Sequence, residues 1–186
     1  LGGRVRFAVS GAAALAPEVG EFIDTLGIVV LEGYGLTEST AGGTGSTPKE
    51  RKIGSVGKPL PGMRVELDKN VTSAGPDEGE IILYGPCIMR GYHNQPEQTR
   101  ASFTADGGLR TGDLGKIDKD GFLFITGRVK ELYKLSNGKY VAPAALEEKL
   151  QLSQYIAQAF VYGSDRTHNT AVIVADMPSV EAYCTR

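Results

Sequence analysis

The sequence is poor in cysteine and contains no block of like charge. Its two cysteines, Cys87 and Cys184, lie far apart and form no Cys-x-x-Cys pair. The sequence therefore predicts neither a zinc site nor a disulfide framework, and this cysteine usage suits a reducing compartment. The formal net charge is only −2 and the charged residues are scattered. There is consequently no electrostatic case for binding nucleic acid or an anionic membrane surface.

Long apolar runs are missing as well. No segment reaches the ~20 apolar residues of a membrane-spanning helix, and no secretory signal is visible. We therefore predict a cytoplasmic protein and leave peripheral membrane association open. The chain can still bury a core in one or two domains, because 41% of its 186 residues are hydrophobic. Its 25 glycines sit mainly at turn-like points, which predicts many short strands.

The first part of the chain has the pattern of a strand, a turn, a helix and a second strand. Residues 4–9 alternate between polar and apolar, as in a half-buried strand. A helix is expected to begin at Pro17 and to end at Gly27, and residues 28–31 form an apolar run typical of a buried strand. The apolar stripe of the helix comprises Val19, Phe22, Ile23 and Leu26. This order predicts a βαβ unit, with ligands at the carboxyl ends of its parallel strands.

Small-residue turns follow both strands of this unit. The first is Gly11-Ala12-Ala13, and the second is Gly33-Tyr34-Gly35-Leu36-Thr37-Glu38. Glycine lets the backbone come close to a ligand, and Tyr34 could present its ring face to a planar base. Thr37 offers a hydroxyl for a phosphate, and Glu38 a carboxylate for a hard cation such as Mg²⁺. The alternatives are a plain tight turn at Gly11 and a surface turn with a half-buried aromatic ring at Tyr34.

Beyond residue 53 the pattern changes to short strands separated by turns rich in glycine and aspartate. Residues 41–51 are expected to form a mobile loop with solvated charges at its end. Candidate strands follow at residues 63–67, 80–85 and 121–127. Short strands at this spacing favour a small, partly open barrel.

The last third of the chain mixes helix and strand. Residues 136–139, Ser-Asn-Gly-Lys, predict a hairpin turn, because Asn-Gly is a strong turn signal. A helix is expected from Pro143, with Leu146 and Leu150 facing inward and Glu147 to Lys149 outward. Two strands are expected at residues 156–162 and 171–175.

Three polar residue types are candidates for chemistry. Asp113 follows Thr111-Gly112 before an expected strand, where a carboxylate could accept both hydroxyls of a ribose diol; the alternative is an aspartate that caps a turn. Arg128 supplies a planar, permanently charged fork, although an arginine after glycine is often a surface charge. His93 has no neighbouring serine or cysteine nucleophile and is expected to be structural, and His168 to be solvated.

Three motifs together carry a resemblance to a known family. They are Gly-Tyr-Gly-Leu-Thr-Glu at 33–38, Leu-Arg-Thr-Gly-Asp-Leu at 109–114 and Thr-Gly-Arg-Val-Lys-Glu at 126–131. In this order they resemble the adenylate-forming superfamily, which includes acyl-CoA synthetases, luciferases and peptide-synthetase adenylation domains. The run at 134–143 is most similar to the long-chain fatty acyl-CoA synthetase branch. The resemblance extends over residues 9–176.

The resemblance implies an ATP-dependent long-chain fatty acid–CoA ligase that forms acyl-AMP and then acyl-CoA. Fatty acid, ATP and CoA would be its substrates, with AMP and Mg²⁺ bound on the way, and no nucleic acid. Alternatives are an aryl or medium-chain CoA ligase, an acyl-AMP ligase, a carboxylate reductase adenylation domain, or a truncated, non-catalytic nucleotide-binding piece. Acyl chain length and oligomeric state are not predicted.

The resemblance also implies residue roles in nucleotide binding. Gly11 and Ala12 would lie beside the acyl and adenine pockets, and Gly33 to Gly35 would hold adenine with Tyr34 packed on it. Thr37 would bond the α-phosphate, and Glu38 would hold Mg²⁺.

Further roles fall in the later motifs. Asp113 would hold the ribose, with Arg128 beside it. Lys130 would be the hinge about which the C-terminal domain turns, unless it is simply a solvated lysine. Gly138 would belong to the turn that enters the active site for thioester formation.

The implied fold is α/β plus β. Residues 1–53 would be the remnant of a βαβ nucleotide-binding lobe, 54–129 a small β-barrel subdomain, and 130–186 a partial α+β C-terminal domain. The chain begins at Leu1 rather than Met and ends at Arg186, soon after a helix expected from Pro178, so we expect a fragment. The family's phosphate loop would precede it and a catalytic lysine would follow it, and the fragment alone is expected to be inactive.

Overall fold

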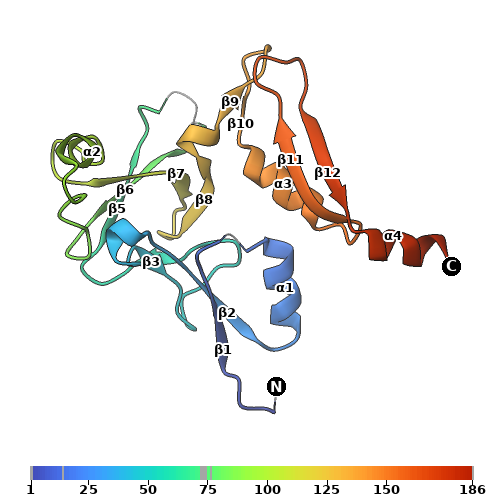
Figure 1. Cartoon of the computed structure of the whole chain (residues 1–186). Helices are drawn as coiled ribbons and strands as arrows, with labels where there is room; N and C mark the ends of the chain where they lie inside the picture. Colours follow the sequence, from blue (N-terminus) through green and yellow to red (C-terminus); the bar gives the residue numbers. More distant parts are fainter. Residues whose placement is uncertain (1, 14, 72–74, 76, 186) are drawn as a thin grey trace. The chain divides into compact units, whose positions relative to one another are not determined.

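The computed structural model describes residues 2–13, 15–71, 75 and 77–185 of the 186-residue chain. These residues form two compact units, 1–125 and 126–186. Each unit is described by itself, and the chain can be followed by colour in Figure 1. No described helix is long and apolar enough to cross a membrane. The fold as a whole is mixed α/β with several separate sheets.

The first unit opens with the predicted βαβ unit. Strand β1 (Phe7–Ser10) and strand β2 (Val29–Tyr34) pair in parallel, with Ser10 opposite Glu32. Helix α1 (Pro17–Thr25) connects them and lies beside β2 (Figure 1). Antiparallel pairing then extends the sheet through β3 (Thr44–Gly45) to β4 (Lys58–Pro59). This sheet brings the carboxyl ends of β1 and β2 to one edge, where the sequence predicted a ligand site.

Helix α1 confirms the predicted boundaries, and most of its apolar stripe lies at the surface. Pro17 occupies the first turn with Glu18 beside it, and Gly27 follows the helix with a φ of +76°. The apolar stripe is not buried, since Phe22 is 64% exposed and Leu26 60% exposed. The buried residue of α1 is Gly20, which lets the helix come close to Ile53.

The segment 41–51 was predicted to be a loop, and this was wrong in part. Gly42, Gly43 and Thr44 are buried, and β3 begins at Thr44. The Thr44 hydroxyl donates to the Val56 carbonyl at 2.6 Å. Buried backbone must find hydrogen-bond partners, and here β2 and β4 supply them. The glycine-rich composition therefore reflects close backbone packing.

A second sheet has four strands in the order β5, β6, β7, β8, and its last strand runs from the first unit into the second. These strands are β5 (Arg64–Asp68), β6 (Gly79–Tyr84), β7 (Leu109–Ile117) and β8 (Leu123–Arg128). Helix α2 (Pro96–Ala101) lies in the connection between β6 and β7. Among the described residues β5 and β8 are the two ends of an open sheet, so the expected barrel is not a closed one.

The core of the first unit lies on that second sheet. Its buried cluster consists of Met63, Ile81, Leu83, Leu109 and Leu123. Tyr34 at the end of β2 and Leu36 in the turn after it pack against the cluster. The turn after β2 is therefore held by the main core rather than by its own lobe alone.

The second unit confirms the predicted hairpin and strands. Strands β9 (Tyr133–Lys134) and β10 (Tyr140–Val141) pair antiparallel around Asn137-Gly138. Helix α3 (Pro143–Gln151) then packs on β11 (Ile156–Tyr162), which pairs with β12 (Thr170–Ala175). The short helix η2 (Val129–Glu131) precedes β9, and α4 (Met177–Cys184) follows β12.

One side chain of this unit that was predicted to face solvent does not do so. The Glu147 carboxylate accepts a hydrogen bond from the Val161 backbone at 2.7 Å. It therefore connects α3 to β11 rather than pointing to solvent. Periodicity placed Glu147 beside the apolar stripe of α3, and a side chain at the stripe's border can reach the neighbouring strand.

Candidate functional site

The turn after β2 is built by close backbone packing. Any Cβ on Gly35 would clash with the Ala41 carbonyl, and a Cβ on Gly33 would lie 3.3 Å from the Thr44 carbonyl. Contacts within the protein itself thus require glycine at 35, whereas a side chain at 33 would need the neighbouring backbone to shift by a few tenths of an ångström. Their packing fixes the position of Tyr34 between them and directs the chain into the short helix η1 (Thr37–Ser39).

Tyr34 and Asp113 meet although 79 residues separate them. The Tyr34 hydroxyl donates a hydrogen bond to Asp113 Oδ2 at 2.7 Å. Asp113 is only 4% exposed, while Tyr34 is half-buried and packs on the core cluster. The structure therefore brings together residues of two separate motifs, one predicted for adenine and one for ribose.

Asp113 lies within strand β7, where the sequence had placed it before a strand. Gly112, its neighbour, has a φ of +73°, which interrupts the regular ladder. The Thr111 hydroxyl donates to the Ile81 carbonyl at 2.8 Å and accepts from the Asp113 amide at 3.1 Å. Thr111 and Gly112 thus form an irregularity inside a long strand, and the strand that was expected after Asp113 begins already at Leu109.

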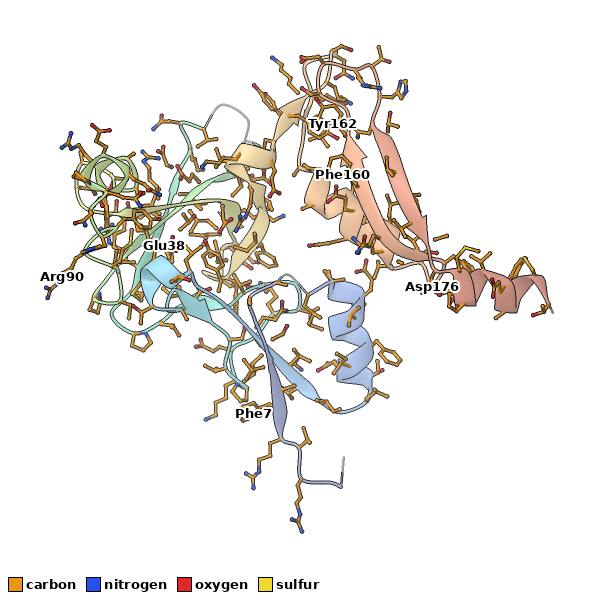
Figure 2. All side chains as sticks on the ribbon, in the orientation of Figure 1. Phe7, Glu38, Arg90, Phe160, Tyr162 and Asp176 are labelled. Atoms are coloured by element: carbon orange, nitrogen blue, oxygen red, sulfur yellow. The ribbon has the colours of Figure 1, made fainter. Side chains whose placement is uncertain are left out.

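Glu38 lies on η1 in the first unit (Figure 2). Its Oε1 accepts a hydrogen bond from the Tyr92 hydroxyl at 2.8 Å, and its carbonyl accepts from the Met89 amide at 2.7 Å. The Glu38 carboxylate, with burial as a second cause, raises the pKa of Tyr92. The neighbouring Thr37 is exposed. The connection between β6 and α2 therefore holds Glu38.

The donor set fits a magnesium ion shared with a nucleotide better than a cage made by protein alone. Among the described residues no group of three or more His, Cys, Asp or Glu side chains could hold a metal. Mg²⁺ is usually bound through one or two carboxylates together with substrate phosphates. Glu38, beside the exposed Thr37 hydroxyl, offers one such carboxylate.

The first predicted turn lies beside the second. A Cβ on Gly11 would be 3.6 Å from the Gly33 carbonyl, so the two strand ends are neighbours. Ala12 has a φ of +66°, a left-handed conformation that is uncommon outside glycine. Gly11 and Ala12 are exposed, as an edge that receives a ligand would be.

The remaining predicted residues belong to the second unit. Arg128 ends β8, and Lys130 lies in η2. Gly138 has a φ of +86°, and its amide donates to the Leu135 carbonyl at 2.9 Å in the hairpin turn. These three residues are described within their own unit.

A hollow in the second unit contains none of the predicted site residues. An open, mainly apolar hollow of about 310 Å³ lies between α3 and the β11–β12 sheet. Leu146, Leu150 and Val161 are among its lining residues. The chemistry of the first unit gathers instead around Tyr34, Asp113 and Glu38.

Sequence reasoning missed the residues that support these side chains. Tyr92 contacts Glu38 from 54 positions away, and Glu80 accepts from the Gly112 amide at 3.2 Å. No local spacing signals such pairs. Only the fold brings them together, because both depend on which segments pack beside the motifs.

Comparisons with known proteins identify the family of the chain. Residues 1–93 match the family described as AMP-binding enzyme, and residues 131–183 match the AMP-binding enzyme C-terminal domain. The chain is 41% identical to long-chain-fatty-acid–CoA ligase FadD15 of Mycobacterium bovis, over 100% of this chain and 30% of that protein. It is also 41% identical to human long-chain-fatty-acid–CoA ligase 6, over 97% of this chain and 26% of that protein.

The chain is also similar in structure to a solved synthetase. O-succinylbenzoate coenzyme A synthetase (MenE) from Bacillus subtilis, in complex with ATP and magnesium ion, superimposes with a TM-score of 0.80 at 30% identity. The match covers 96% of this chain and 39% of that one. The chain spans 30% or less of the length of FadD15 and of human long-chain-fatty-acid–CoA ligase 6.

Proposed function

Because the chain belongs to the AMP-binding enzyme family, we propose that it is part of an ATP-dependent long-chain fatty acid–CoA ligase. The fatty acid carboxylate attacks the α-phosphorus of ATP, which gives acyl-AMP and releases pyrophosphate. The thiol of CoA then attacks the acyl carbon and displaces AMP. This activity is proposed for the full-length protein, since the ligases to which the chain is similar are much longer.

One observation carries the proposal. The hydrogen bond from Tyr34 to Asp113 joins the motif proposed for adenine to the motif proposed for ribose. A buried carboxylate beside an aromatic ring is suited to a nucleoside, because the ring offers a face to the base and the carboxylate accepts from sugar hydroxyls. The names of the similar ligases support a fatty acid as the acid substrate.

The nucleoside part of the site comes from the two strand-end turns and β7. We assign adenine binding to Gly33, Tyr34 and Gly35, with Gly11 and Ala12 at the neighbouring edge. Asp113 holds the ribose hydroxyls. The closeness of the Gly11 and Gly33 turns supports a common edge.

The phosphate part of the site comes from η1. Thr37 donates its hydroxyl to the α-phosphate, and Glu38 holds Mg²⁺ through its carboxylate. When bound, the ion neutralises negative charge on the phosphates. The similarity to a synthetase that binds ATP and magnesium ion supports this assignment. Most of the protein's task in this step is to position the reactants and to balance charge.

The second half-reaction is assigned to the segment that begins near Arg128. Arg128 contacts the ribose and phosphate region, Lys130 is the hinge, and Gly138 belongs to the turn that helps admit CoA. Closure of this kind needs backbone rotation at only a few residues. We propose the corresponding division into a lobe at 1–53, a barrel-like subdomain at 54–129 and a partial C-terminal domain at 130–186.

The ribose assignment can be tested in the full-length protein that carries this chain. Asp113→Ala is expected to raise the KM for ATP at least tenfold, because a charge-assisted pair to the ribose is lost. Asp24→Asn serves as the matched control, since it removes an ion pair to Arg51 at 2.6 Å elsewhere in the same unit. Unchanged ATP kinetics in Asp113→Ala would remove the ribose assignment.

A further inference from the structure

Strand β7 carries Asp113 on a bulge in which three of its residues stand opposite one residue of β6. The ladder with β6 pairs Glu80 with Leu114 and Ile82 with Arg110. Ile81 alone therefore stands opposite residues 111–113 of β7. Bulges of this kind redirect a side chain and are common next to functional sites.

The bulge leaves backbone groups without their usual ladder partners, and neighbouring side chains replace them. The Thr111 hydroxyl accepts from the Asp113 amide at 3.1 Å. The Gly112 amide donates instead to Glu80 Oε1 at 3.2 Å. Gly112 has a φ of +73°, a left-handed conformation. The hydrogen bond from its amide to Glu80 therefore helps to hold the bend of the chain just before Asp113.

The second carboxylate oxygen of Glu80, which lies on β6, also accepts a hydrogen bond from a residue of β7. Its Oε2 accepts from Arg110 Nη1 at 2.6 Å, and Arg110 also donates to Asp68 Oδ2 at 3.2 Å. Glu80 is only 7% exposed. A buried carboxylate is costly unless it is paired and hydrogen-bonded, and here both oxygens are engaged on the residues that lead into Asp113.

We propose that Glu80 is a positioning residue for Asp113, and that it sets the preference of the site for a nucleotide with intact ribose hydroxyls. The inference rests on the proposed function. Glu80 does not touch the nucleotide; it holds the Gly112 amide, and through it the direction of the Asp113 carboxylate. Small misplacements of such a group are felt strongly in binding and rate.

The test compares two ligands in the full-length protein that carries this chain. The affinities for AMP and for 2′,3′-dideoxy-AMP are measured by calorimetry, and their ratio reports the use of the ribose hydroxyls. Wild type is expected to prefer AMP. Glu80→Gln is expected to reduce the ratio about tenfold, with most of its affinity for dideoxy-AMP retained. Near-UV circular dichroism and the Tm establish that each variant is folded.

Two comparisons separate positioning from general destabilisation. Asp24→Asn, which breaks the ion pair to Arg51, is expected to leave the ratio unchanged. In an Asp113→Asn background, Glu80→Gln is expected to reduce the ratio no further, because its effect passes through Asp113. Independent, additive losses would contradict the inference.

The outcomes distinguish this inference from the proposed function. If wild type shows no preference for AMP, the ribose assignment fails, and the inference fails with it. If Asp113→Asn loses the preference while folded Glu80→Gln keeps it, the ribose assignment stands and the inference is overturned. Should Glu80→Gln not fold, Glu80→Asp is measured in its place. It keeps a negative charge beside Arg110 but shortens the reach to Gly112, and full retention of the ratio would again overturn the inference.

Discussion

Strands β6 and β12 have six residues each and are both mainly apolar, yet their surroundings are opposite. Five residues of β6 are buried and the sixth, Tyr84, is half-buried. All six residues of β12 are exposed, and Val172 is 65% exposed. The difference lies in what covers each strand, because the core cluster packs around Ile81 and Leu83 of β6, whereas helix α3 packs on β11, the partner of β12. Apolar composition predicts a strand, but only the fold determines what covers it.

The same comparison bears on the candidate site. Asp113, Tyr34 and Glu38 belong to the unit that contains β6, and Asp113 lies in the strand paired with it. A site that must hold side chains within small tolerances benefits from such a rigid, well-packed support. The unit that contains β12 carries the residues to which we assign hinge and turn roles.

The largest expected effect on stability comes from a substitution that disrupts the packing around β6. Leu83→Ala removes a fully buried side chain of the core cluster and is expected to lower the free energy of unfolding by about 2–5 kcal/mol. Val172→Ala on β12 is the matched control and is expected to change it by less than about 1 kcal/mol. Urea unfolding of both variants measures the two changes. Equal losses would contradict the contrast between the strands.

A second prediction concerns the backbone packing that supports Tyr34. Gly35→Ala places a Cβ against the Ala41 carbonyl, so the free energy of unfolding is expected to fall by about 3 kcal/mol, near the upper end of overpacking costs. Gly75→Ala is the control, because its Cβ would meet only the Glu78 side chain, at 3.6 Å or more. A Gly35→Ala protein as stable as the control would show that the turn can shift without cost.

The smallest expected effect is a pH dependence at the turn between β7 and β8. The hydrogen bond from Lys52 lowers the pKa of Asp118. A lowered pKa in the folded state contributes stability above the ordinary aspartate value of about 3.9, and this contribution is lost as the pH falls through the lowered value. Asp118→Asn should therefore be less stable than wild type at pH 6, with the difference shrinking towards pH 3. A difference independent of pH would contradict this role.

The sequence was a good guide wherever a signal is local. The βαβ unit, the Pro17 start of α1, the hairpin at Asn137-Gly138 and the strand β11 all follow from patterns of a few residues. The full length of strand β7 was not predicted: a strand was expected only after Asp113, because Gly112 at the bulge is typical of a turn. The spacing of apolar residues in α1 could not indicate that Phe22 is exposed. Such spacing shows which residues share a face of the helix, but not what packs against that face.

The candidate site divides in the same way. The motifs around Tyr34, Glu38 and Asp113 were visible in the sequence because each is a short run of characteristic residues. Their supports, Glu80 and Tyr92, are ordinary residues in other segments, and only the packing of those segments gives them a role.

The central claim is that one nucleotide is held between Tyr34, Glu38 and Asp113. A crystal structure of the full-length protein with AMP and Mg²⁺ tests it most directly. The account predicts adenine against the Tyr34 ring, the ribose hydroxyls on the Asp113 carboxylate, and the ion on the Glu38 carboxylate. Density for AMP at any place remote from these three side chains would contradict it.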